Sequence, residues 1–204
     1  NLAPRIWGNT VLDMAYDYST ETMYVLGLTF LNQYFNKVFL YTLDLDTGVM
    51  DQVGTHEIYG ARTSYGVGSL ACDLEGNLYC VERGNAFAEF YQLKLEDGEP
   101  VCTRIGATGF GSDASYITSM AFDHIREPCI GNCYGYIMSG SSEGYQHSLI
   151  RLDPATGEGT DLGRIEGFET VGLYIPYDRS HGPVRSSNWH FRKQPVYLKG
   201  RAPS

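Results

Sequence analysis

Short runs of alternating apolar and polar residues follow one another along the chain, and glycine-containing turns separate them. In one such run, Leu43 and Leu45 fall on one face and Asp44 falls on the other. A period of two residues predicts β-strands that bury one face. The turn that follows, Asp46-Thr47-Gly48, places glycine where a tight hairpin requires a positive φ angle. Because no segment shows a helical period, the pattern predicts an all-β protein built from hairpins.

The alternation predicts three successive groups of four strands. The first strands span 11–17, 67–73 and 117–123, the second 22–28, 77–83 and 133–139, the third 38–45, 89–95 and 147–152, and the fourth 49–54, 101–106 and 159–163. Short turns within each group favour antiparallel pairing of neighbouring strands. We therefore expect three four-stranded antiparallel sheets that begin near Val11, Val67 and Ile117.

The three groups also repeat one sequence motif. The first strands end in Met14-Ala15-Tyr16-Asp17, Leu70-Ala71-Cys72-Asp73 and Met120-Ala121-Phe122-Asp123, and the fourth strands end in Val53-Gly54, Ile105-Gly106 and Leu162-Gly163. A repeat of this size with four short strands is typical of a β-propeller blade. The sequence thus predicts a propeller-like array of three blades with flanking strands, which is an incomplete propeller. Met14, Leu70 and Met120 share one position and are expected to be buried between sheets.

The repeat divides the chain into a propeller segment, 1–177, and a basic extension, 178–204. The predicted blades span about 11–60, 61–112 and 113–167, and a final strand spans 168–177. The extension has six cationic side chains against Asp178, so it carries +5 of a net charge of −9 and leaves −14 on the body. We expect the extension to be disordered, because it lacks alternation and turn signals. An acidic body repels nucleic acids and anionic membranes, and no apolar run is long enough to insert into a membrane.

Five cysteines leave at least one thiol unpaired within the chain. Cys72 and Cys80 flank a predicted turn in an arrangement that is awkward for a disulfide, so buried free thiols are the favoured interpretation. Cys129 and Cys133 share one loop, where a disulfide remains an open alternative. The cysteines alone therefore do not assign a redox compartment.

The repeat motif resembles the blades of secreted bacterial propellers of the broad YVTN/quinoprotein-like class. The resemblance rests on Met-Ala-Phe-Asp, a Leu-Tyr strand, Leu-Asp-Pro-Ala-Thr-Gly and a closing Leu-Gly, and it covers residues 11–177. The string 171–176, Val-Gly-Leu-Tyr-Ile-Pro, also resembles the last strand before Ig-like modules in large cell-surface proteins. The resemblance implies an extracellular or cell-surface location. Quinoprotein enzymes show tryptophan-docking repeats that this chain lacks, which argues against a quinone cofactor.

No motif predicts a catalytic residue, a metal site or a cofactor. Asp17, Asp73 and Asp123 end equivalent strands and could ring a channel mouth around a cation, but each precedes a turn that its carboxylate can cap. The capping interpretation is the favoured one. The calcium-loop pattern that starts at Asp44 fails at its twelfth position, which is Thr55. The histidines lack metal-ligand spacing, and no Gly-x-Ser-x-Gly elbow is present.

Long connections on one end of the predicted sheets carry aromatic residues among polar neighbours. The connections span 29–37, 55–66, 84–88, 107–116 and 140–147, and the candidate ligand-binding residues are Tyr34, Phe35, Tyr59, Tyr65, Phe87, Phe110, Tyr116, Tyr145 and His147. Such rings favour recognition of sugars by stacking or of protein by anchoring, and the alternative is that they seal the packing between blades.

The leading functional hypothesis is non-catalytic, extracellular recognition of a glycan or a protein. One alternative is a lyase or hydrolase at the mouth of the propeller channel, which a converging pair of desolvated carboxylates or a Tyr/His pair would favour. Another is a structural spacer in a surface protein. We also expect self-association through the exposed edges of the first and last blades.

Overall fold

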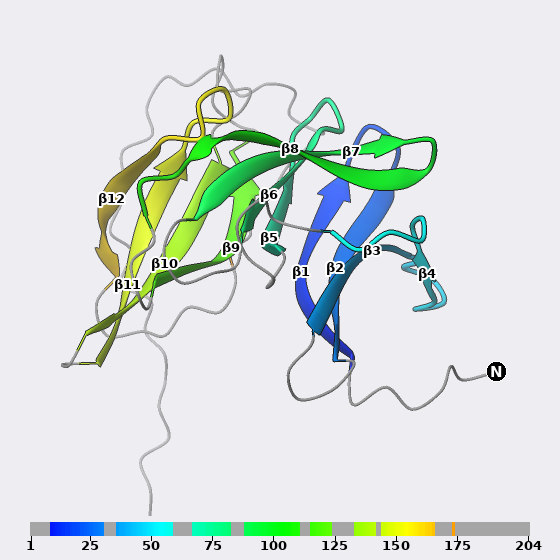
Figure 1. Cartoon of the computed structure of the whole chain (residues 1–204), viewed down its shortest axis with the longest axis horizontal. Coiled ribbons are helices and arrows are strands. Elements are labelled where there is room, and N and C mark those ends of the chain that lie inside the picture. The colour runs from blue at the N-terminus through cyan, green and yellow to red at the C-terminus, as the bar shows by residue number, and fades with distance from the viewer. Residues whose placement is uncertain are drawn as a thin grey trace, which may run out of the picture.

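The structure is a computed structural model that describes residues 9–30, 36–58, 67–82, 88–110, 115–123, 133–141, 144–165 and 173. These residues form three four-stranded sheets (Figure 1). The first sheet contains β1 (Asn9–Asp17), β2 (Thr22–Phe30), β3 (Asn36–Leu43) and β4 (Met50–Gln52). The second contains β5 (Val67–Cys72), β6 (Leu78–Glu82), β7 (Glu89–Glu96) and β8 (Glu99–Ala107). The third contains β9 (Ser115–Phe122), β10 (Cys133–Ser141), β11 (Gly144–Leu152) and β12 (Gly159–Ile165).

Every sheet is an open antiparallel meander in which strands pair in chain order. The described residues contain no helix, and hence none that could cross a membrane. The prediction of an all-β chain with four-stranded antiparallel sheets is therefore confirmed. The sheets start at Asn9, Val67 and Ser115, close to the predicted positions.

The third sheet corrects the predicted position of one loop. Ser141 pairs with Gly144, so β10 and β11 meet in a tight hairpin and the span 140–147 is not a long connection. Tyr145 and His147 lie within β11, opposite Gly140 and Met138. The alternation had placed the start of this strand too late, because glycine and serine interrupt its apolar positions.

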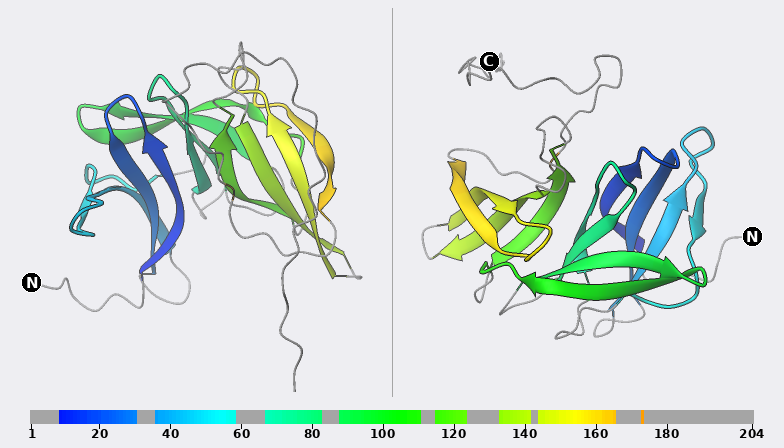
Figure 2. Two further views of the ribbon diagram at one scale, coloured as in Figure 1. Left: turned by 180° about the vertical axis from the view of Figure 1, so that it is seen from behind. Right: turned by 90° about the horizontal axis from the view of Figure 1, so that it is seen from above.

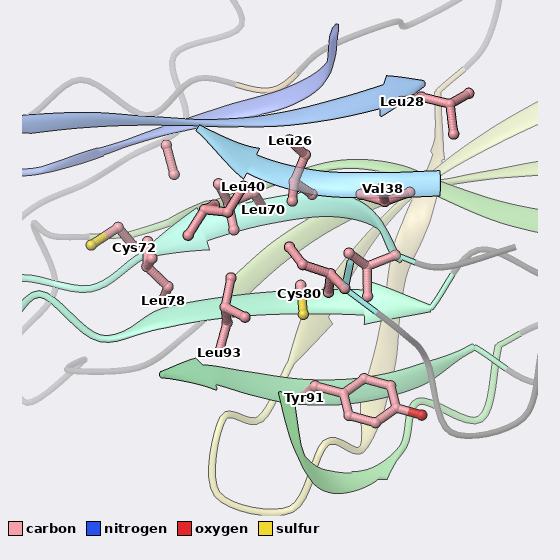
Figure 3. Close-up of a cluster of buried hydrophobic side chains, with 13 residues drawn as sticks. Leu26, Leu28, Val38, Leu40, Leu70, Cys72, Leu78, Cys80, Tyr91 and Leu93 are labelled. Atoms are coloured by element: carbon pink, nitrogen blue, oxygen red, sulfur yellow. The ribbon is translucent and has the colours of Figure 1, made fainter. Parts of the chain in front are cut away.

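Two hydrophobic clusters fill the spaces between consecutive sheets. In the first, Leu26 and Leu40 of the first sheet pack against Leu70, Cys80 and other residues of the second sheet (Figure 3). A second cluster joins the second sheet to the third and includes Phe90 and Met120. Residues that alternate along one strand enter different clusters, because side chains of a strand point to opposite faces. The second sheet is thereby buried on both faces.

The burial of Met14 was predicted wrongly. Leu70 and Met120 are buried, whereas Met14 is 50% exposed. Leu70 lies in the cluster toward the first sheet, and Met120 lies in the cluster toward the second sheet. Both side chains thus point toward the preceding sheet. The first sheet has no preceding sheet among the described residues, so Met14 meets no such partner.

Consecutive sheets also touch at Gly54, just after β4, and at Gly106, near the end of β8. A Cβ placed on Gly54 would lie 2.9 Å from the carbonyl oxygen of Gly98, in the β7–β8 turn of the next sheet. A Cβ placed on Gly106 would collide with the carbonyl oxygen of Thr156, in the β11–β12 turn. Glycine is required at these two positions because the turn backbone of the following sheet comes this close.

Replacing Gly106 by Ala is therefore expected to lower the unfolding free energy by roughly 1–3 kcal/mol, because the methyl group pushes a turn backbone away. Urea denaturation would measure the loss. The neighbouring Ala107→Ser change adds an atom on the exposed side and should stay within about 0.5 kcal/mol. Equal effects of the two changes would show that the close approach of the two sheets is absent in solution.

Several predicted elements lie outside the described residues. These are the connections 31–35, 59–66, 83–87, 111–114 and 124–132, the final strand 168–177 apart from Leu173, and the basic extension 178–204. The predicted blade boundaries fall largely in these segments.

Candidate functional site

A polar cluster lies where the first strands of the three sheets come together. One extra residue bulges each strand at a corresponding place: between Val11 and Asp13 in β1, between Val67 and Ser69 in β5, and between Ile117 and Met120 in β9. Bulges bend a strand and redirect its side chains. Asp13, Ser69 and Ser119 lie at corresponding places beside these bulges, so each sheet has one polar residue there.

The carboxylate of Asp13 links all three sheets. Its Oδ2 accepts a hydrogen bond from the backbone N–H of Leu70 at 2.9 Å, and its Oδ1 accepts one from the N–H of Met14 at 3.0 Å. The hydroxyl of Ser119 lies 3.4 Å from Oδ1 and accepts a hydrogen bond from the N–H of Leu173 at 3.1 Å. Leu173, which follows the third sheet in the chain, thus also contacts Ser119.

Enclosure of this carboxyl changes its protonation. Burial raises the pKa of Asp13 from 3.8 to about 7, although backbone hydrogen bonds from Leu70, Met14 and Met120 oppose the change. Desolvation disfavours the ionised form more than these donors favour it. Asp13 therefore exchanges its proton near neutral pH, which is the property that a general base or a pH-sensitive contact requires.

Ser69 lies at the corresponding bulge of β5. The residue is fully buried, and its Oγ has no hydrogen-bond partner among the described residues. A buried polar atom without a hydrogen-bond partner costs free energy, so this hydroxyl lowers the stability of the fold. The sequence prediction missed this cluster. Its signal was available, because Asp13, Ser69 and Ser119 are separated by the same intervals as Ala15, Ala71 and Ala121.

The aspartates that end the first strands cap turns. Asp17 Oδ1 accepts hydrogen bonds from the N–H and the hydroxyl of Ser19 at 2.8 and 2.7 Å, and its Oδ2 accepts one from the hydroxyl of Thr20. Asp73 accepts bonds from the backbone of Glu75 and from both the backbone and the side chain of Asn77. The capping interpretation is confirmed for these two residues, and a cation ring gains no support from them.

Three cysteines carry free thiols, and two of them touch. Sγ of Cys80 lies 3.7 Å from Sγ of Cys102, although the two strands are separated by β7. The hydrogen bond with Cys102 and burial raise the pKa of Cys80 well above its usual range. Burial, with the nearby charges of Asp17 and Asp73, also raises the pKa of Cys72. Buried free thiols are confirmed for Cys72 and Cys80, whereas Cys102 is half-buried, and the Cys129–Cys133 alternative lies outside the described side chains.

The structure describes few of the predicted ligand-binding residues. Tyr34, Phe35, Tyr59, Tyr65 and Phe87 lie outside the described residues, and Tyr116, Tyr145 and His147 are placed only by the backbone of β9 and β11. Phe110 is half-buried and packs on the second hydrophobic cluster and on Gly159. Its ring therefore serves the contact between the second and third sheets, while its backbone borders the connection to β9.

Two of the connections leave the sheets from one place. The N–H of Ala88 donates to the carbonyl of Phe110 at 3.1 Å, and the N–H of Thr108 donates to the carbonyl of Ala88 at 2.9 Å. Ala88 follows the β6–β7 connection and Phe110 precedes the β8–β9 connection. These hydrogen bonds hold the roots of both connections side by side on one end of the second sheet.

The opposite end of the sheets carries compact turns. The N–H of Asp44 donates to Val49 in the β3–β4 turn, and the N–H of Asp73 donates to Asn77 in the β5–β6 turn. Glu99, in the β7–β8 turn, accepts backbone hydrogen bonds from Thr55 and His56 at 2.7 and 2.9 Å, and these bonds lower its pKa. Thr55 and His56 follow β4 and begin the β4–β5 connection, so the β7–β8 turn lies against the long-connection end of the first sheet and not against its turns.

The described residues contain no group of three or more His, Cys, Asp or Glu side chains that could hold a metal ion. No protein-family model matches the chain, and no curated protein matches it either. The function therefore has to be argued from the geometry.

Proposed function

We propose that this chain is part of a propeller-like array that recognises a glycan or a protein ligand without catalysis. The three sheets act as blades in this proposal, as in the secreted propellers of the YVTN/quinoprotein-like class. Ligand binding takes place on the end that bears the β2–β3, β4–β5, β6–β7 and β8–β9 connections. An extracellular or cell-surface location belongs to the same proposal.

The joined roots of two connections are the observation that carries this proposal. Hydrogen bonds between Ala88, Thr108 and Phe110 fix where the segment 83–87 ends and where the segment 111–114 begins. A rigid scaffold that presents neighbouring loops is a common basis for recognition. Tyr145, near the β10–β11 hairpin, lies on the same end of its own sheet because every meander reverses direction at each connection.

The ligand chemistry follows from charge and aromatic content. The chain carries a net charge of −9, which disfavours nucleic acids and other polyanions. Tyrosine and phenylalanine rings offer flat apolar surface with a polar edge. A neutral glycan or a basic protein patch suits this combination.

The triple change of Tyr34, Phe35 and Tyr145 to Ala is expected to abolish binding on a glycan or surface-protein array, while the melting temperature changes little. The control is Tyr18→Ala, which removes a ring from the β1–β2 turn at the opposite end and should leave binding intact. Retained binding together with lower stability would assign the three rings to packing and would refute the proposed binding surface.

Asp13 favours the enzyme as the second candidate. A carboxyl with a pKa of about 7 beside the hydroxyl of Ser119 can act as a general base in a lyase or hydrolase. The described residues place no second carboxyl in this cluster, so the recognition function is the better supported one. A panel of polysaccharides assayed for new reducing ends separates the two, because turnover that Asp13→Asn removes from a folded protein would establish the enzyme.

A further inference from the structure

The second sheet lies between the first and the third, so that one of its faces meets the preceding sheet and the other meets the next (Figure 2). Val67 and Leu70 of the second sheet face the first sheet, and Val81 and Phe90 face the third. The outward face of the first sheet is called the leading face, and that of the third sheet is called the trailing face. No described sheet covers either of them.

The leading face shows apolar side chains where the other sheets bury theirs. Val11 and Met14 are 49% and 50% exposed, whereas Val67 and Leu70, at the corresponding places beside the β5 bulge, are fully buried. Met50, which pairs with Leu43 across the β3–β4 turn, is 39% exposed. The same side chains would be buried if a sheet packed on this face.

The trailing face lacks a contact that the other two sheets make. Gly54 and Gly106 each meet the turn backbone of the next sheet, but no described atom lies within 4 Å of a Cβ placed on Gly163. Leu162, beside this glycine, is 44% exposed, while Ile105 beside Gly106 packs on the second cluster. The trailing face therefore presents Leu162 and Gly163 at the places where Ile105 and Gly106 contact the third sheet, but no described turn packs on them.

The β3–β4 turn of the first sheet has the form that the trailing face accepts. Within it, Asp44 N–H donates to Val49 at 2.9 Å and Gly48 N–H donates to Asp44 at 2.8 Å. The turn that docks on Gly106 has the same two bonds, from Asp153 to Glu158 at 2.9 Å and from Gly157 to Asp153 at 2.7 Å. The β3–β4 turn is exposed, and a Cβ on Gly48 would meet no described atom.

We propose that a second copy of this chain docks its leading face and its β3–β4 turn on the trailing face of the first copy. The contact reproduces the arrangement that joins the first sheet to the second and the second to the third. It is heterologous, because different surfaces of the two copies meet, and it forms a ring if the rotation closes and a filament if it does not. The interface buries Met14, Met50 and Leu162 and brings the Thr47 carbonyl to Gly163.

Sedimentation velocity of the full chain over a range of concentrations tests the proposal. The wild type is expected to associate as concentration rises. Met14→Asp and Leu162→Asp should each weaken association by at least about tenfold, because each places a charge in an apolar contact. The matched control is Leu95→Asp on the second sheet, since Leu95 is also 44% exposed but lies on neither outward face.

Mixing the variants distinguishes a head-to-tail contact from a symmetric one. The Met14→Asp protein keeps an intact trailing face and the Leu162→Asp protein keeps an intact leading face, so an equimolar mixture should form a heterodimer with wild-type affinity. Circular dichroism of each variant confirms that it is folded. A wild type that stays monomeric at all concentrations, or a mixture of folded variants that fails to associate, would overturn the proposal.

Discussion

Replacing Leu70 by Ala is expected to lower the unfolding free energy by roughly 2–5 kcal/mol, because it removes a fully buried side chain from the contact between two sheets. Met14→Ala, at the corresponding place in the first sheet, should cost less than about 1 kcal/mol, because half of that side chain is already exposed. Urea denaturation in dilute solution, where the chain is unassociated, measures both changes.

The comparison of the two variants is more informative than either one alone. Both residues follow the bulge of a first strand, so the two changes to Ala have similar effects on the strand backbone. The difference between the two losses of unfolding free energy therefore measures the effect of the sheet that covers Leu70. Similar losses for Met14 and Leu70 would show that another part of the chain covers the leading face. Such a result would also count against docking of a second copy there.

The unfolding free energy should depend on pH between about 4 and 7 through Asp13. The pKa of the Asp13 carboxyl is about 7 in the folded chain. In the unfolded chain, where water surrounds the carboxyl, its pKa is 3.8. The folded state thus binds more protons in this interval, so the contribution of Asp13 is largest below 3.8 and is lost as the pH rises through 7. Each pKa unit corresponds to about 1.4 kcal/mol.

The Asp13→Asn variant isolates this contribution, because asparagine has a similar shape and does not titrate. Its unfolding free energy minus that of the wild type should increase by a few kcal/mol as the pH is raised from about 4 to 7. The control Asp44→Asn removes an exposed carboxyl whose pKa is lowered by hydrogen bonds from Thr47 and Asp46, so it should not reproduce this trend. A flat difference curve for Asp13→Asn would mean that water reaches the carboxyl freely.

The secondary structure could be predicted from the sequence because it depends on interactions between residues that are close in the chain. Alternation, turn glycines and short hairpin spacings depend on neighbouring residues, and they predicted the sheets and the start of β5 at Val67. The turn-capping role of Asp17 and Asp73 was also predictable, because the acceptor and its donors lie within four residues. The β10–β11 hairpin was predicted with less success, since glycine and serine obscure its alternation.

Burial and the site were decided by tertiary structure. One sequence position is buried at Leu70 and exposed at Met14, because burial depends on whether another sheet lies across that face. Nothing in the local sequence marks Asp13 as a buried residue, yet burial at the meeting of the sheets raises the pKa of its carboxyl. Cys80 and Cys102 meet across an intervening strand, which no spacing rule indicates. The sequence by itself determined the strands, turns and caps of this protein because these depend on local contacts, whereas contacts between sheets decided its core, its polar cluster and its open faces.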